Sequence, residues 1–579
     1  TDEKHICLDL TELAGRPLAQ FFSVRRDEAE AALGVALAPE LTRWIECLEK
    51  SPVTGRPGQY RPLVLDGRRR LYLYRYWNYE QQLAAAIRTR LSSDNATCNR
   101  ELLRTGLQRY FANPGTVPDW QKVAAFAALT NKFCVISGGP GTGKTFTVTN
   151  ILALMIEQRV NANIRLCAPT GKAVARLQES LVQALPKLPC TEEIRSKIPR
   201  EPSTIHRLLG SVPGSSVFRY NRTNPLAADV VIVDEASMIP LALMAKLCQA
   251  LPEQATLILL GDKDQLASVE AGAVLADICA ASEVRRFSNG FCRAYSAAAG
   301  EELPTEFVST RSDTLVDSAV ELQFSYRFAA APSIGHLSLA VNAGDTAAAA
   351  ELLSDPDGQE VTCRPLYSGR PSEAVLPDSV MEGYLPYLRA ACVQDAYRSF
   401  ETFRILCALR RGYYGVDELN TAIERLLQHA GMISPAARFY HGRPIMITSN
   451  NYRLKLFNGD IGLLWASADN EVRAWFPDAA GAFRNFVPAR LPAHETAYAL
   501  TVHKSQGSEF NRVVLVLPDR ISAVLTRELI YTGITRAKER IEIWSNEAAF
   551  CSMVQARVAR SSGLKEALMA NIDDATLSK

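Results

Sequence analysis

The stretch VISGGPGTGKT, residues 135–145, decides which fold this chain can adopt. From Gly138 to Thr145 it fits the pattern G-x-x-x-x-G-K-[ST] of a phosphate-binding loop. Glycines let backbone N–H groups curl around a phosphate, and the N-terminus of a following helix adds the positive end of its dipole. The β-rich run FCVIS precedes the loop, and the helical pattern TVTNILALMIEQ follows it. The sequence therefore predicts a nucleotide site at the end of a parallel strand.

The side chains of this loop have separate expected roles. Lys144 is expected to reach the β- and γ-phosphates of ATP, and the Thr145 hydroxyl is expected to bind Mg²⁺. The alternative, a tight turn without a ligand, is disfavoured by the strand before the loop and the helix after it. The predicted nucleotide contacts of the loop come from Gly138, Gly139, Gly141, Thr142, Gly143, Lys144 and Thr145.

Two further apolar runs end in the polar residues that phosphoryl transfer requires. VVIVDEAS (230–237) is expected to place Asp234 at the hydration shell of Mg²⁺ and Glu235 as the general base that activates water. LILLGDKDQLASV (257–269) places Gln265 just past another strand. An amide at that position can touch both the γ-phosphate and the attacking water. We therefore predict that Lys144, Glu235 and Gln265 are catalytic residues.

These runs belong to a pattern of short buried strands that alternate with helices. FCVIS, IRLCAP, VVIVD and TLILLGD predict a parallel sheet with its site at the carboxyl ends of the strands. FRILCAL, RVVLVLP and RIEIWS predict a second α/β domain that begins near Leu322. Within it, residues 438–496 are expected to form a small inserted β-barrel. Residues 281–320 show no clear period and are expected to form a long flexible loop.

The first 117 residues predict a separate unit. The helical patterns TELAGRPLAQFF and PELTRWIECLEK precede two β-rich runs, and the turn dipeptide Asp66-Gly67 is expected to join these runs as a hairpin. Three arginines, residues 68–70, follow the turn. They fit either a solvated edge that discourages strand addition or a contact to DNA or to a partner. The segment FANPGTVPDW is expected to be a linker.

Composition limits the classes of protein that this chain can represent. Its 579 residues contain 64 Lys and Arg and 62 Asp and Glu, so the net charge is +2. This balance excludes a basic, histone-like coat and an acidic tail, but it leaves room for a basic groove. No apolar run reaches ~18 residues, so no membrane span is expected. The start TDEKHICLDL is too charged for a secretory signal.

The thirteen cysteines are scattered along the chain, and no two are closer than thirteen residues. A zinc site or iron–sulfur cluster usually needs at least one close pair, so neither is expected. Many cysteines lie in apolar segments such as KFCVIS and RLCAPT. This distribution predicts buried free thiols in a reducing compartment.

In their order along the chain, these stretches resemble the motifs of superfamily 1 DNA helicases. Within that superfamily the sequence is most similar to the RecD family, which supplies the 5′→3′ motor of the RecBCD helicase–nuclease, exonuclease V. The narrower resemblance rests on GGPGTGKT, APTGKA, TIHRLLG (204–210), VDEASM, GDKDQLASVEAGAVL, LFNGDIG (456–462) and VHKSQGSEF. Further stretches match the wider superfamily: APTGKAVARL (168–177), SYRF (325–328), TVHKSQGSEF (501–510) and LIYTGITRAKER (529–540).

The resemblance implies an α/β fold with two RecA-like motor domains and with ATP and Mg²⁺ in the cleft between them. Gln121 matches the glutamine that reads adenine in this superfamily. Arg327 and Arg536 would reach the γ-phosphate from the second domain as arginine fingers, and the alternative is a pair of surface salt-bridge arginines. The implied domains are an N-terminal α+β partner-docking domain (1–117), a first motor domain (118–320, with a small insertion at 181–225), and a second motor domain (321–579, with an SH3-like β-barrel at 438–496).

The resemblance also implies a track for single-stranded DNA. Hydroxyl and amide side chains suit contacts to phosphate and sugar, which read no base sequence. Tyr452 fits either base stacking or core packing, and His206 and His503 fit either DNA contact or a structural hydrogen bond. The insertion at 181–225 is short and Pro-rich, which argues against the wedge that this branch can form there. The expected DNA contacts are Pro169, Thr170, Lys172, Thr204, His206, Asn450, Asn451, Tyr452, Thr501, His503 and Ser505.

The implied function is an ATP-dependent 5′→3′ translocase and helicase subunit that processes double-strand DNA ends in the bacterial cytoplasm. Its expected partners are single-stranded DNA and homologues of RecC and RecB, with residues 1–117 docking on RecC. One alternative is a stand-alone RecD-like helicase, but residues 1–117 show no helix-hairpin-helix repeats of that group. An alternative of another class, a static DNA-binding ATPase scaffold, is disfavoured by the intact ATPase motifs. No nuclease site is expected in this chain.

Overall fold

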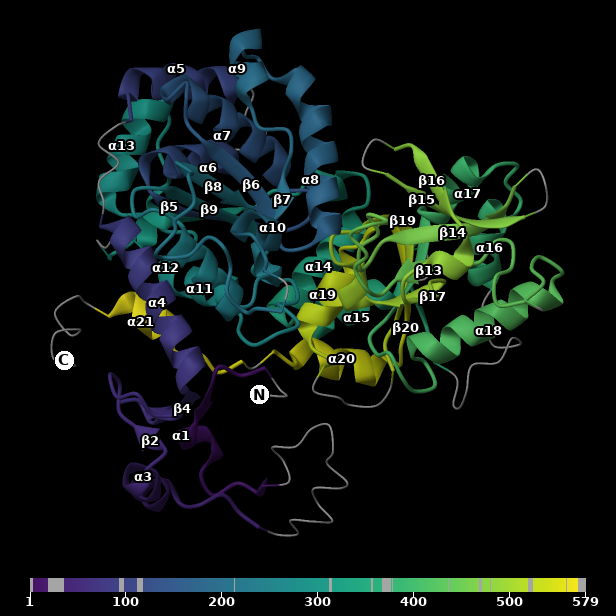
Figure 1. Ribbon diagram of the computed structural model, residues 1–579, viewed down its shortest axis with the longest axis horizontal. Coiled ribbons are helices and arrows are strands. Elements are labelled where there is room, and N and C mark those ends of the chain that lie inside the picture. The colour runs from purple at the N-terminus through teal and green to yellow at the C-terminus, as the bar shows by residue number, and fades with distance from the viewer. Residues whose placement is uncertain are drawn as a thin grey trace. The chain divides into compact units, whose positions relative to one another are not determined.

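The structure is a computed structural model, and its contacts divide the chain into two compact units. Unit 1 comprises Thr1–Lys263, Ala267–Phe324 and Ala559–Lys579, and unit 2 comprises Asp264–Leu266 and Ser325–Val558. Each unit is built on its own parallel sheet, so the predicted α/β class is confirmed (Figure 1). The structure describes residues 4–18, 36–92, 98–111, 118–212, 214–311, 315–355, 358–366, 376, 378–435, 437–467, 471–478, 481–518, 524–558 and 560–570.

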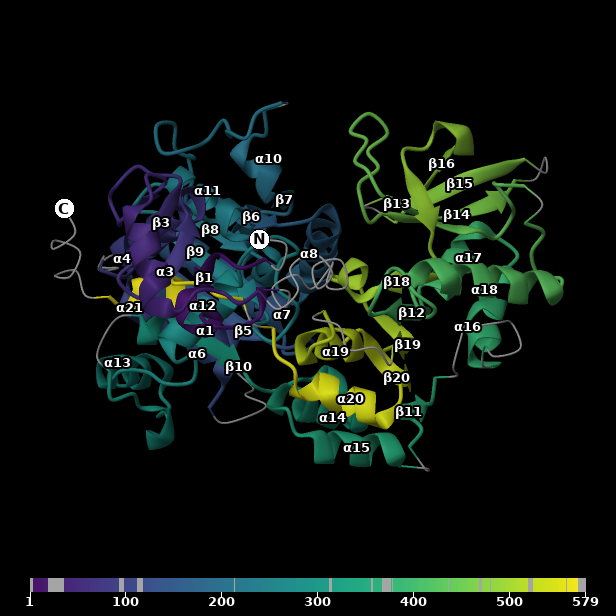
Figure 2. The same cartoon turned by 90° about the horizontal axis from the view of Figure 1, so that it is seen from below.

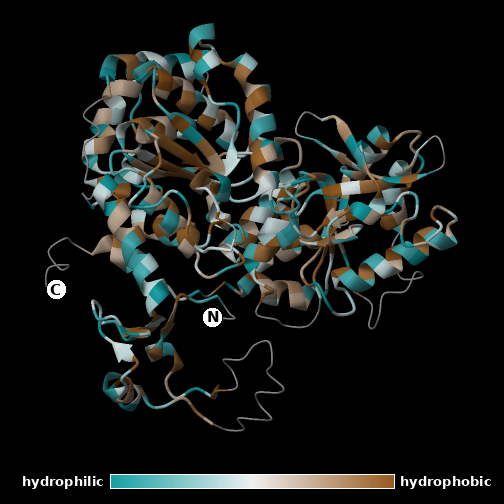
Figure 3. Ribbon diagram, in the orientation of Figure 1, coloured by the Kyte–Doolittle hydropathy of each residue, from teal (hydrophilic) through white to brown (hydrophobic). Residues whose placement is uncertain are grey.

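The main sheet of unit 1 has the strand order β10-β5-β9-β8-β6-β7, and every neighbouring pair is parallel. The four strands predicted from the sequence are all present. Their apolar side chains bury the sheet, and Figure 3 shows these central strands in brown. The strands are β5 (Phe133–Gly138), β6 (Ile164–Ala168), β7 (Ser203–Thr204), β8 (Val230–Val233), β9 (Thr256–Gly261) and β10 (Ala319–Leu322).

Helices cover both faces of this sheet. Along β5, Phe133 and Val135 enter one core cluster and Cys134 and Ile136 enter another, as the two-residue period of a strand requires. The sheet is therefore buried on both sides, which is typical of α/β domains. The helices of unit 1 are α4 (Tyr74–Leu91), α5 (Arg100–Tyr110), α6 (Trp120–Thr130), α7 (Lys144–Gln158), α8 (Gly171–Ala184), α9 (Glu192–Lys197), α10 (Ile205–Leu209), α11 (Leu241–Ala250), α12 (Val274–Ser282), α13 (Asn289–Ala299) and α21 (Leu564–Met569), together with α1 and α3 below.

Residues 281–320 do not form the expected long loop. They contain helix α13, and their last two residues begin β10, which pairs with β5. Phe287, Phe291 and Tyr295 are buried and lie four residues apart, so they form one face of a helix and of the turn before it. The Phe287 and Phe291 rings stack with centroids 4.6 Å apart. The Ser, Ala and Arg residues between these aromatics masked the helical period in the sequence.

The N-terminal part of unit 1 contains a small mixed sheet in the order β1-β4-β3-β2. The hairpin predicted at Asp66-Gly67 is confirmed, because β3 and β4 pair antiparallel on either side of it. The linker expected within FANPGTVPDW lies largely outside the described residues. Tyr72 and Leu257 belong to one core cluster, so this sheet shares a core with the main sheet. The elements are β1 (Cys7–Asp9), α1 (Leu10–Leu13), α3 (Leu41–Lys50), β2 (Thr54–Gly55), β3 (Leu63–Leu65) and β4 (Arg70–Leu73).

Residues 560–570, here called the C-terminal strap, return to unit 1 and pack against its N-terminal part. Helix α21 of the strap contacts α4 and α12, and Figure 1 shows α21 beside α4. Leu564 and Leu568 are buried in the same core cluster as Tyr72. The Ser561 N–H donates to His5 Nδ1 at 3.0 Å. The strap therefore completes a core that begins near the first residues of the chain.

Arg70 binds the C-terminal strap. Its guanidinium lies 2.8 Å from the Asp66 carboxylate and 2.9 Å from the Glu566 carboxylate. Arg68 lies 4.0 Å from the same Glu566, whereas Arg69 is exposed and takes a positive φ of 65° in the turn. Arg70 therefore binds the chain's own strap, a partner that neither expected alternative for this basic run included.

Glu80 is a buried carboxyl group that faces the strap. It accepts hydrogen bonds from the Gly563 N–H at 2.8 Å and from the Ser562 hydroxyl at 3.1 Å. Burial raises the pKa of Glu80 to about 7, against the hydrogen bonds and the Arg70 charge. Burial also raises the pKa of nearby Asp277 to about 7. The contact between the strap and the N-terminal part is therefore sensitive to proton concentration.

Unit 2 has a main sheet in the order β11-β20-β19-β12-β18, again with parallel neighbours. All three strands predicted for this sheet are present. They are β12 (Phe403–Cys407), β19 (Phe510–Val516) and β20 (Ala537–Trp544), joined by β11 (Val361–Arg364) and β18 (Ala499–Thr501). The helices are α14 (Pro332–Ala343), α15 (Thr346–Ser354), α16 (Asp378–Leu388), α17 (Val393–Phe400), α18 (Val416–His429), α19 (Arg527–Ile534) and α20 (Glu547–Gln555).

A second sheet of unit 2 occupies the place of the expected β-barrel insertion. It is antiparallel in the order β16-β15-β14-β13-β17 and has a small core of its own (Figure 2). In the described residues β16 and β17 are its edges, so closure into an SH3-like barrel stays a prediction. The strands are β13 (Pro444–Ile447), β14 (Ile461–Ala466), β15 (Val472–Pro477), β16 (Phe483–Phe486) and β17 (His494–Thr496).

Two general features of the chain follow from the described residues. In that part of the chain, no helix combines the length and the apolar character that a membrane crossing needs. All thirteen cysteines are described, and all are free thiols. Six of them are buried, but Cys47 is exposed, so the expectation of buried thiols holds only for some.

We predict that Glu80→Gln changes the pH dependence of stability. The unfolded carboxyl group loses its proton near pH 4.5 and the folded one near pH 7, so the folded state binds more protons between these values. Stability of the wild type should therefore fall as pH rises through this window. The variant should lose the part of this fall that Glu80 contributes, while Asp277 keeps its own part, and it should be more stable at pH 8 by on the order of 3 kcal/mol.

Denaturant unfolding of the full chain at several pH values measures this effect. Glu46→Gln, an equivalent change at an exposed position of α3, serves as the control and should follow the wild type. Parallel pH profiles for Glu80→Gln and the wild type would contradict the prediction.

Candidate functional site

The loop between β5 and α7 has the backbone that phosphate binding requires. Gly141 and Gly143 take positive φ angles of 76° and 82°, which glycine adopts without strain. A Cβ on Gly138 would lie 2.6 Å from the Thr142 hydroxyl oxygen, so this position also needs glycine. Helix α7 begins at Lys144, directly after the loop, and its first N–H groups have no partner within the helix. The loop therefore offers a concentration of N–H donors to an anion.

Lys144 and Gln121 lie against this loop. The Lys144 ammonium donates hydrogen bonds to the carbonyl oxygens of Gly138 and of Gly139, the latter at 3.0 Å. The Gln121 amide donates to the Thr142 carbonyl oxygen at 3.0 Å. Gln121 comes from α6, whose N-cap is Asp119. The structure thus brings the predicted adenine reader and the predicted phosphate-binding lysine to the same loop.

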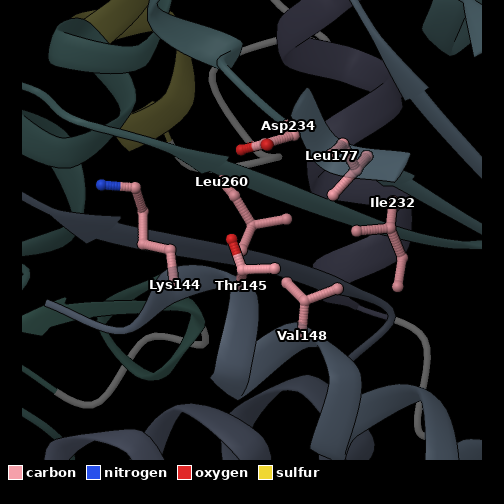
Figure 4. A pocket seen from close by; sticks show the side chains of 7 residues that line it. All are labelled: Lys144, Thr145, Val148, Leu177, Ile232, Asp234 and Leu260. Carbon is pink, nitrogen blue, oxygen red and sulfur yellow. The ribbon is translucent and has the colours of Figure 1, made fainter. Parts of the chain in front are cut away.

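Asp234 and Thr145 border one pocket beside the loop (Figure 4). Asp234 follows the last residue of β8, and Thr145 is the second residue of α7. Burial raises the pKa of Asp234, the adjacent Glu235 charge raises it further, and Lys144 opposes both. A hydroxyl and a carboxylate are oxygen donors of the kind that Mg²⁺ binds, and a buried carboxylate gains stability from a nearby cation. This donor set fits the predicted Mg²⁺ ion.

Glu235 has an unusual backbone conformation. Its φ and ψ angles are 52° and 41°, in the left-handed region that side chains rarely adopt. Its N–H donates to the Asp234 carboxylate at 2.9 Å. Strained conformations of this kind cluster at functional sites, because a fixed direction of the side chain outweighs the strain. The conformation supports a functional role for Glu235, and the role of general base stays a prediction.

Gln265 lies in a short segment that belongs to unit 2 by its contacts, although β9, just before it, belongs to unit 1. In this segment the Leu266 N–H donates to the Thr532 hydroxyl at 2.9 Å. The Leu266 carbonyl oxygen accepts a hydrogen bond from the Gln506 amide at 3.0 Å. Gln265 itself is buried. The glutamine predicted to face the γ-phosphate is thus held by residues of unit 2.

Arg327 and Arg536 meet at one place in unit 2. The Arg327 guanidinium lies 2.6 Å from the Glu509 carboxylate and donates to the Thr535 carbonyl oxygen at 3.4 Å. Arg536 is buried and donates to the Ser508 carbonyl oxygen at 3.2 Å. The alternative of two surface arginines does not fit Arg536, because it is buried. The predicted reach of both guanidinium groups to a γ-phosphate stays a prediction.

The expected DNA contacts of unit 1 follow two neighbouring strands. Pro169, Thr170 and Lys172 come after β6. Thr204 ends β7, which pairs with β6 at the edge of the sheet, and His206 follows β7. Both threonines are helix N-caps, of α8 and α10. His206 is exposed by surface area, but partial loss of its hydration lowers the pKa of its imidazole. The structure therefore brings these five residues to one edge, away from β5.

The expected DNA contacts of unit 2 include a loop between β13 and β14 that contains residues 450–452. Tyr452 is 71% exposed, so the alternative of core packing is wrong. Its ring contacts only the edge of Phe457, with centroids 5.9 Å apart, among the ring contacts of the described residues. The Lys504 ammonium donates to the Asn458 side chain in the same loop at 3.1 Å. The loop thus lies beside the motif TVHKSQGSEF.

Thr501, His503 and Ser505 belong to a short 3₁₀ helix at the edge strand β18. Thr501 is the N-cap of this helix, η9 (Val502–Ser505), and its hydroxyl accepts from the Lys504 N–H at 3.3 Å. His503 is half-buried. Ser505 is fully buried, and its hydroxyl donates to the Val502 carbonyl oxygen at 2.7 Å. This burial argues against a direct contact between the Ser505 side chain and DNA.

Three residues of these sites were missed in the sequence. Gln506 and Thr532 lie inside the quoted motifs, but their partners are distant in the chain and no local pattern shows them. Glu321, in β10, binds Lys263 at 3.0 Å and Arg285 at 2.6 Å. An acidic residue inside the apolar run AVEL was a signal that could have shown this last cluster.

Family models match three parts of the chain. A model of an AAA domain matches residues 121–271, and a model of a UvrD-like helicase C-terminal domain matches residues 496–541. A model of the N-terminal domain of RecBCD enzyme subunit RecD matches residues 1–72. The first two matches cover the phosphate-binding loop and the late motifs, respectively.

Curated relatives extend the similarity over most of the chain. RecBCD enzyme subunit RecD of Haemophilus influenzae is 36% identical over 86% of this chain and 80% of its own length. RecD of Mycolicibacterium smegmatis is 36% identical over 97% of this chain and 90% of its own length. The ATP-dependent RecD2 DNA helicase of Deinococcus radiodurans is 27% identical over 94% of this chain and 64% of its own length. A structure of Bacteroides Pif1 bound to single-stranded DNA is a looser neighbour, with 15% identity, a TM-score of 0.39, and coverage of 75% of this chain and 94% of the other.

We predict that Lys144→Gln abolishes ATP hydrolysis while the chain still folds. Glutamine is shorter than lysine by one atom and lacks its positive charge for phosphate, so turnover should fall at least ~100-fold. Phosphate release with and without single-stranded DNA measures this loss. Lys132→Gln, the same change at a lysine that binds the exposed Gln254 side chain, should keep wild-type turnover. Turnover of the Lys144 variant within about tenfold of wild type would contradict the assignment.

Proposed function

Because this chain belongs to the RecD family of RecBCD enzyme subunits, we propose that it is a motor that moves 5′→3′ along single-stranded DNA in a complex with RecB and RecC homologues. The chain is an ATP-dependent DNA helicase. The direction, the complex and the roles of individual residues are the proposed steps. We also propose that it works in the bacterial cytoplasm, on the ends of broken duplexes.

One observation supports the motor most directly: two kinds of expected contact lie on one sheet. The phosphate-binding loop follows β5 and Asp234 follows β8, whereas the expected DNA contacts follow β6 and β7. Since β8 is paired with β6, a movement of the residues beside the nucleotide can pass to the expected DNA contacts through two adjacent strands. This arrangement suits a protein that converts hydrolysis into movement along a strand.

In the proposed mechanism, this chain's residues bind and orient the nucleotide. Bound ATP supplies the phosphoryl group, and Mg²⁺ would be held by Thr145 and by Asp234 through its hydration shell. The loop N–H groups and Lys144 bind the β- and γ-phosphates. Glu235 takes a proton from the attacking water, and the Gln265 amide orients that water. These assignments rest on residue types and local geometry.

Arg327 and Arg536 complete this mechanism. Each guanidinium carries a fixed positive charge that would stabilise the charge on the transferred phosphoryl group. Their shared contacts around Ser508 and Thr535 mean that both would move together with unit 2. Binding and hydrolysis of ATP would then alternate two arrangements of the motor, and each cycle would advance the strand.

The partners are proposed from the family of the chain. Two curated relatives at 36% identity are named as RecBCD enzyme subunits, and a RecD N-terminal domain model matches residues 1–72. We propose that this part of unit 1 docks on a RecC homologue. The second candidate is a stand-alone helicase, which the similarity to the Deinococcus radiodurans RecD2 helicase favours.

We predict that unwinding requires a single-stranded 5′ overhang. Partial duplexes with either a 5′ or a 3′ overhang, offered to the full chain with ATP, distinguish the two directions. A 5′→3′ motor should displace the strand only from the 5′-tailed substrate, because it must load on the tail and move toward the duplex. The Lys144→Gln variant controls for spontaneous melting. Unwinding from the 3′ tail would refute the proposed direction.

We predict that the chain forms a stable heterotrimer with RecB and RecC homologues from its own organism. Size-exclusion chromatography of the purified chains, alone and mixed, should show a complex of all three and retention of this chain through the column. Omission of the RecC homologue should release this chain from the RecB homologue. An active monomer that does not join the mixture would instead favour the stand-alone helicase.

A further inference from the structure

We propose that Thr532 and Gln506 are positioning residues that tie Gln265 to unit 2 and thereby make ATP hydrolysis depend on DNA. The inference deepens the proposed function and rests on it. It starts from the three-residue segment Asp264–Leu266, which is flanked on both sides by unit 1 but has its contacts in unit 2. Such a segment needs specific anchors, because the chain before it and after it belongs elsewhere.

Thr532 and Gln506 both form hydrogen bonds with Leu266, the residue next to Gln265. Both polar groups of the Leu266 peptide unit are bound: its N–H donates to the Thr532 hydroxyl at 2.9 Å, and its carbonyl oxygen accepts from the Gln506 amide at 3.0 Å. The Leu266 side chain is 4% exposed and belongs to the main core cluster of unit 2. Thr532 and Gln506 are buried too. Buried hydrogen bonds of this kind are costly to break, so the segment follows unit 2 when that unit moves.

Thr532 also joins this segment to an arginine. Its hydroxyl donates to the Glu528 carbonyl oxygen at 2.7 Å and also accepts from the Leu266 N–H, so the hydroxyl acts as both donor and acceptor. Its own carbonyl oxygen accepts from Arg536 Nε at 3.0 Å. One residue of α19 therefore contacts both the segment with Gln265 and the arginine proposed to act on the same phosphate. A displaced α19 would misplace both groups together.

Gln506 joins the segment to the expected DNA track. It is the residue directly after η9, the short helix that contains His503 and that Thr501 caps. Lys504, in the same helix, binds Asn458 in the loop that contains Tyr452. A strand bound along this surface would fix η9, and η9 would fix Leu266 through the Gln506 amide. The contacts thus form a continuous path from the DNA-facing loop to Gln265.

The other end of the segment is fixed to the nucleotide loop. The Lys263 N–H donates to the Ser137 hydroxyl at 3.3 Å, and Ser137 directly precedes Gly138. Gln265 therefore lies between an anchor in unit 1, two residues before it, and an anchor in unit 2, one residue after it. Because the two anchors are so close in the chain, the position of the Gln265 amide depends on both. This dependence would let bound DNA set the geometry of the attacking water.

The test compares Thr532→Val with Thr526→Val in the full chain. Valine matches threonine in shape but cannot accept the Leu266 N–H, so the first change removes one anchor. Thr526 is the N-cap of the same helix and is also buried, and its hydroxyl has no hydrogen-bond partner in the described part of the chain. Thr532→Ser keeps the hydroxyl and should restore the anchor. Gln506→Glu replaces the donor of the second anchor by an acceptor.

The readout is ATP turnover with and without saturating single-stranded DNA. Thr532→Val and Gln506→Glu should each lower the ratio of DNA-stimulated to DNA-free turnover about ten-fold, the effect of about one lost buried hydrogen bond. The KM for ATP should stay within about twofold, because the nucleotide contacts are intact. Thr526→Val and Thr532→Ser should keep the wild-type ratio. A merely structural role for Thr532 would instead give equal losses in both valine variants.

The outcomes separate this inference from the function on which it rests. A wild-type chain whose ATP turnover does not respond to DNA would overturn the proposed motor and this inference with it. A responsive wild type, with Thr532→Val and Gln506→Glu indistinguishable from Thr526→Val, would overturn the inference alone. Loss of stimulation in Thr532→Ser equal to that in Thr532→Val would also overturn it, since the hydroxyl would then be irrelevant.

Discussion

The parallel register of β5, β9 and β8 is the constraint on which the site in unit 1 depends. Val135 and Val233 are both paired with Leu259, so β5 and β8 reach the same edge of the sheet together. The glycine loop and Asp234 leave the sheet at that edge, where parallel strands place binding sites. A slip of one residue would exchange the two buried faces and separate the two groups. The apolar residues that bury the strands therefore also place the polar residues that follow them.

Positive and negative side chains nearly balance in this chain, and several of its arginines bind partners within their own unit. The net charge of +2 leaves no general attraction for DNA, and the expected DNA contacts are mostly hydroxyl and amide groups. Arg70, Arg327 and Arg536 all have partners inside the chain. Recognition of a strand through capped helix ends and neutral side chains would weaken less with salt than recognition through a basic coat.

The sequence was most informative where a pattern is local. Buried strands, the hairpin turn and the glycine loop each follow from adjacent residues, and the structure has all of them. The misses have physical reasons. In α13, small residues between the apolar ones obscure the helical period. Arg70 binds a residue almost five hundred positions later in the chain. The Ser505 hydroxyl is buried and bound to the backbone. The hydrogen bond between Leu266 and Thr532 forms because a short segment of the chain leaves unit 1 and joins unit 2, and no local pattern encodes this change of unit.

The C-terminal strap has a consequence for how the protein is made. During synthesis the residues of the N-terminal sheet leave the ribosome long before Leu564 and Leu568, so the core around Tyr72 stays incomplete until α21 is translated. Apolar surface beside β1 and β4 therefore stays open on the nascent chain while all the residues between β4 and α21 are synthesised. Such surface favours aggregation or capture by a chaperone. The sheet around Tyr72 thus becomes fully native long after its own residues have been synthesised.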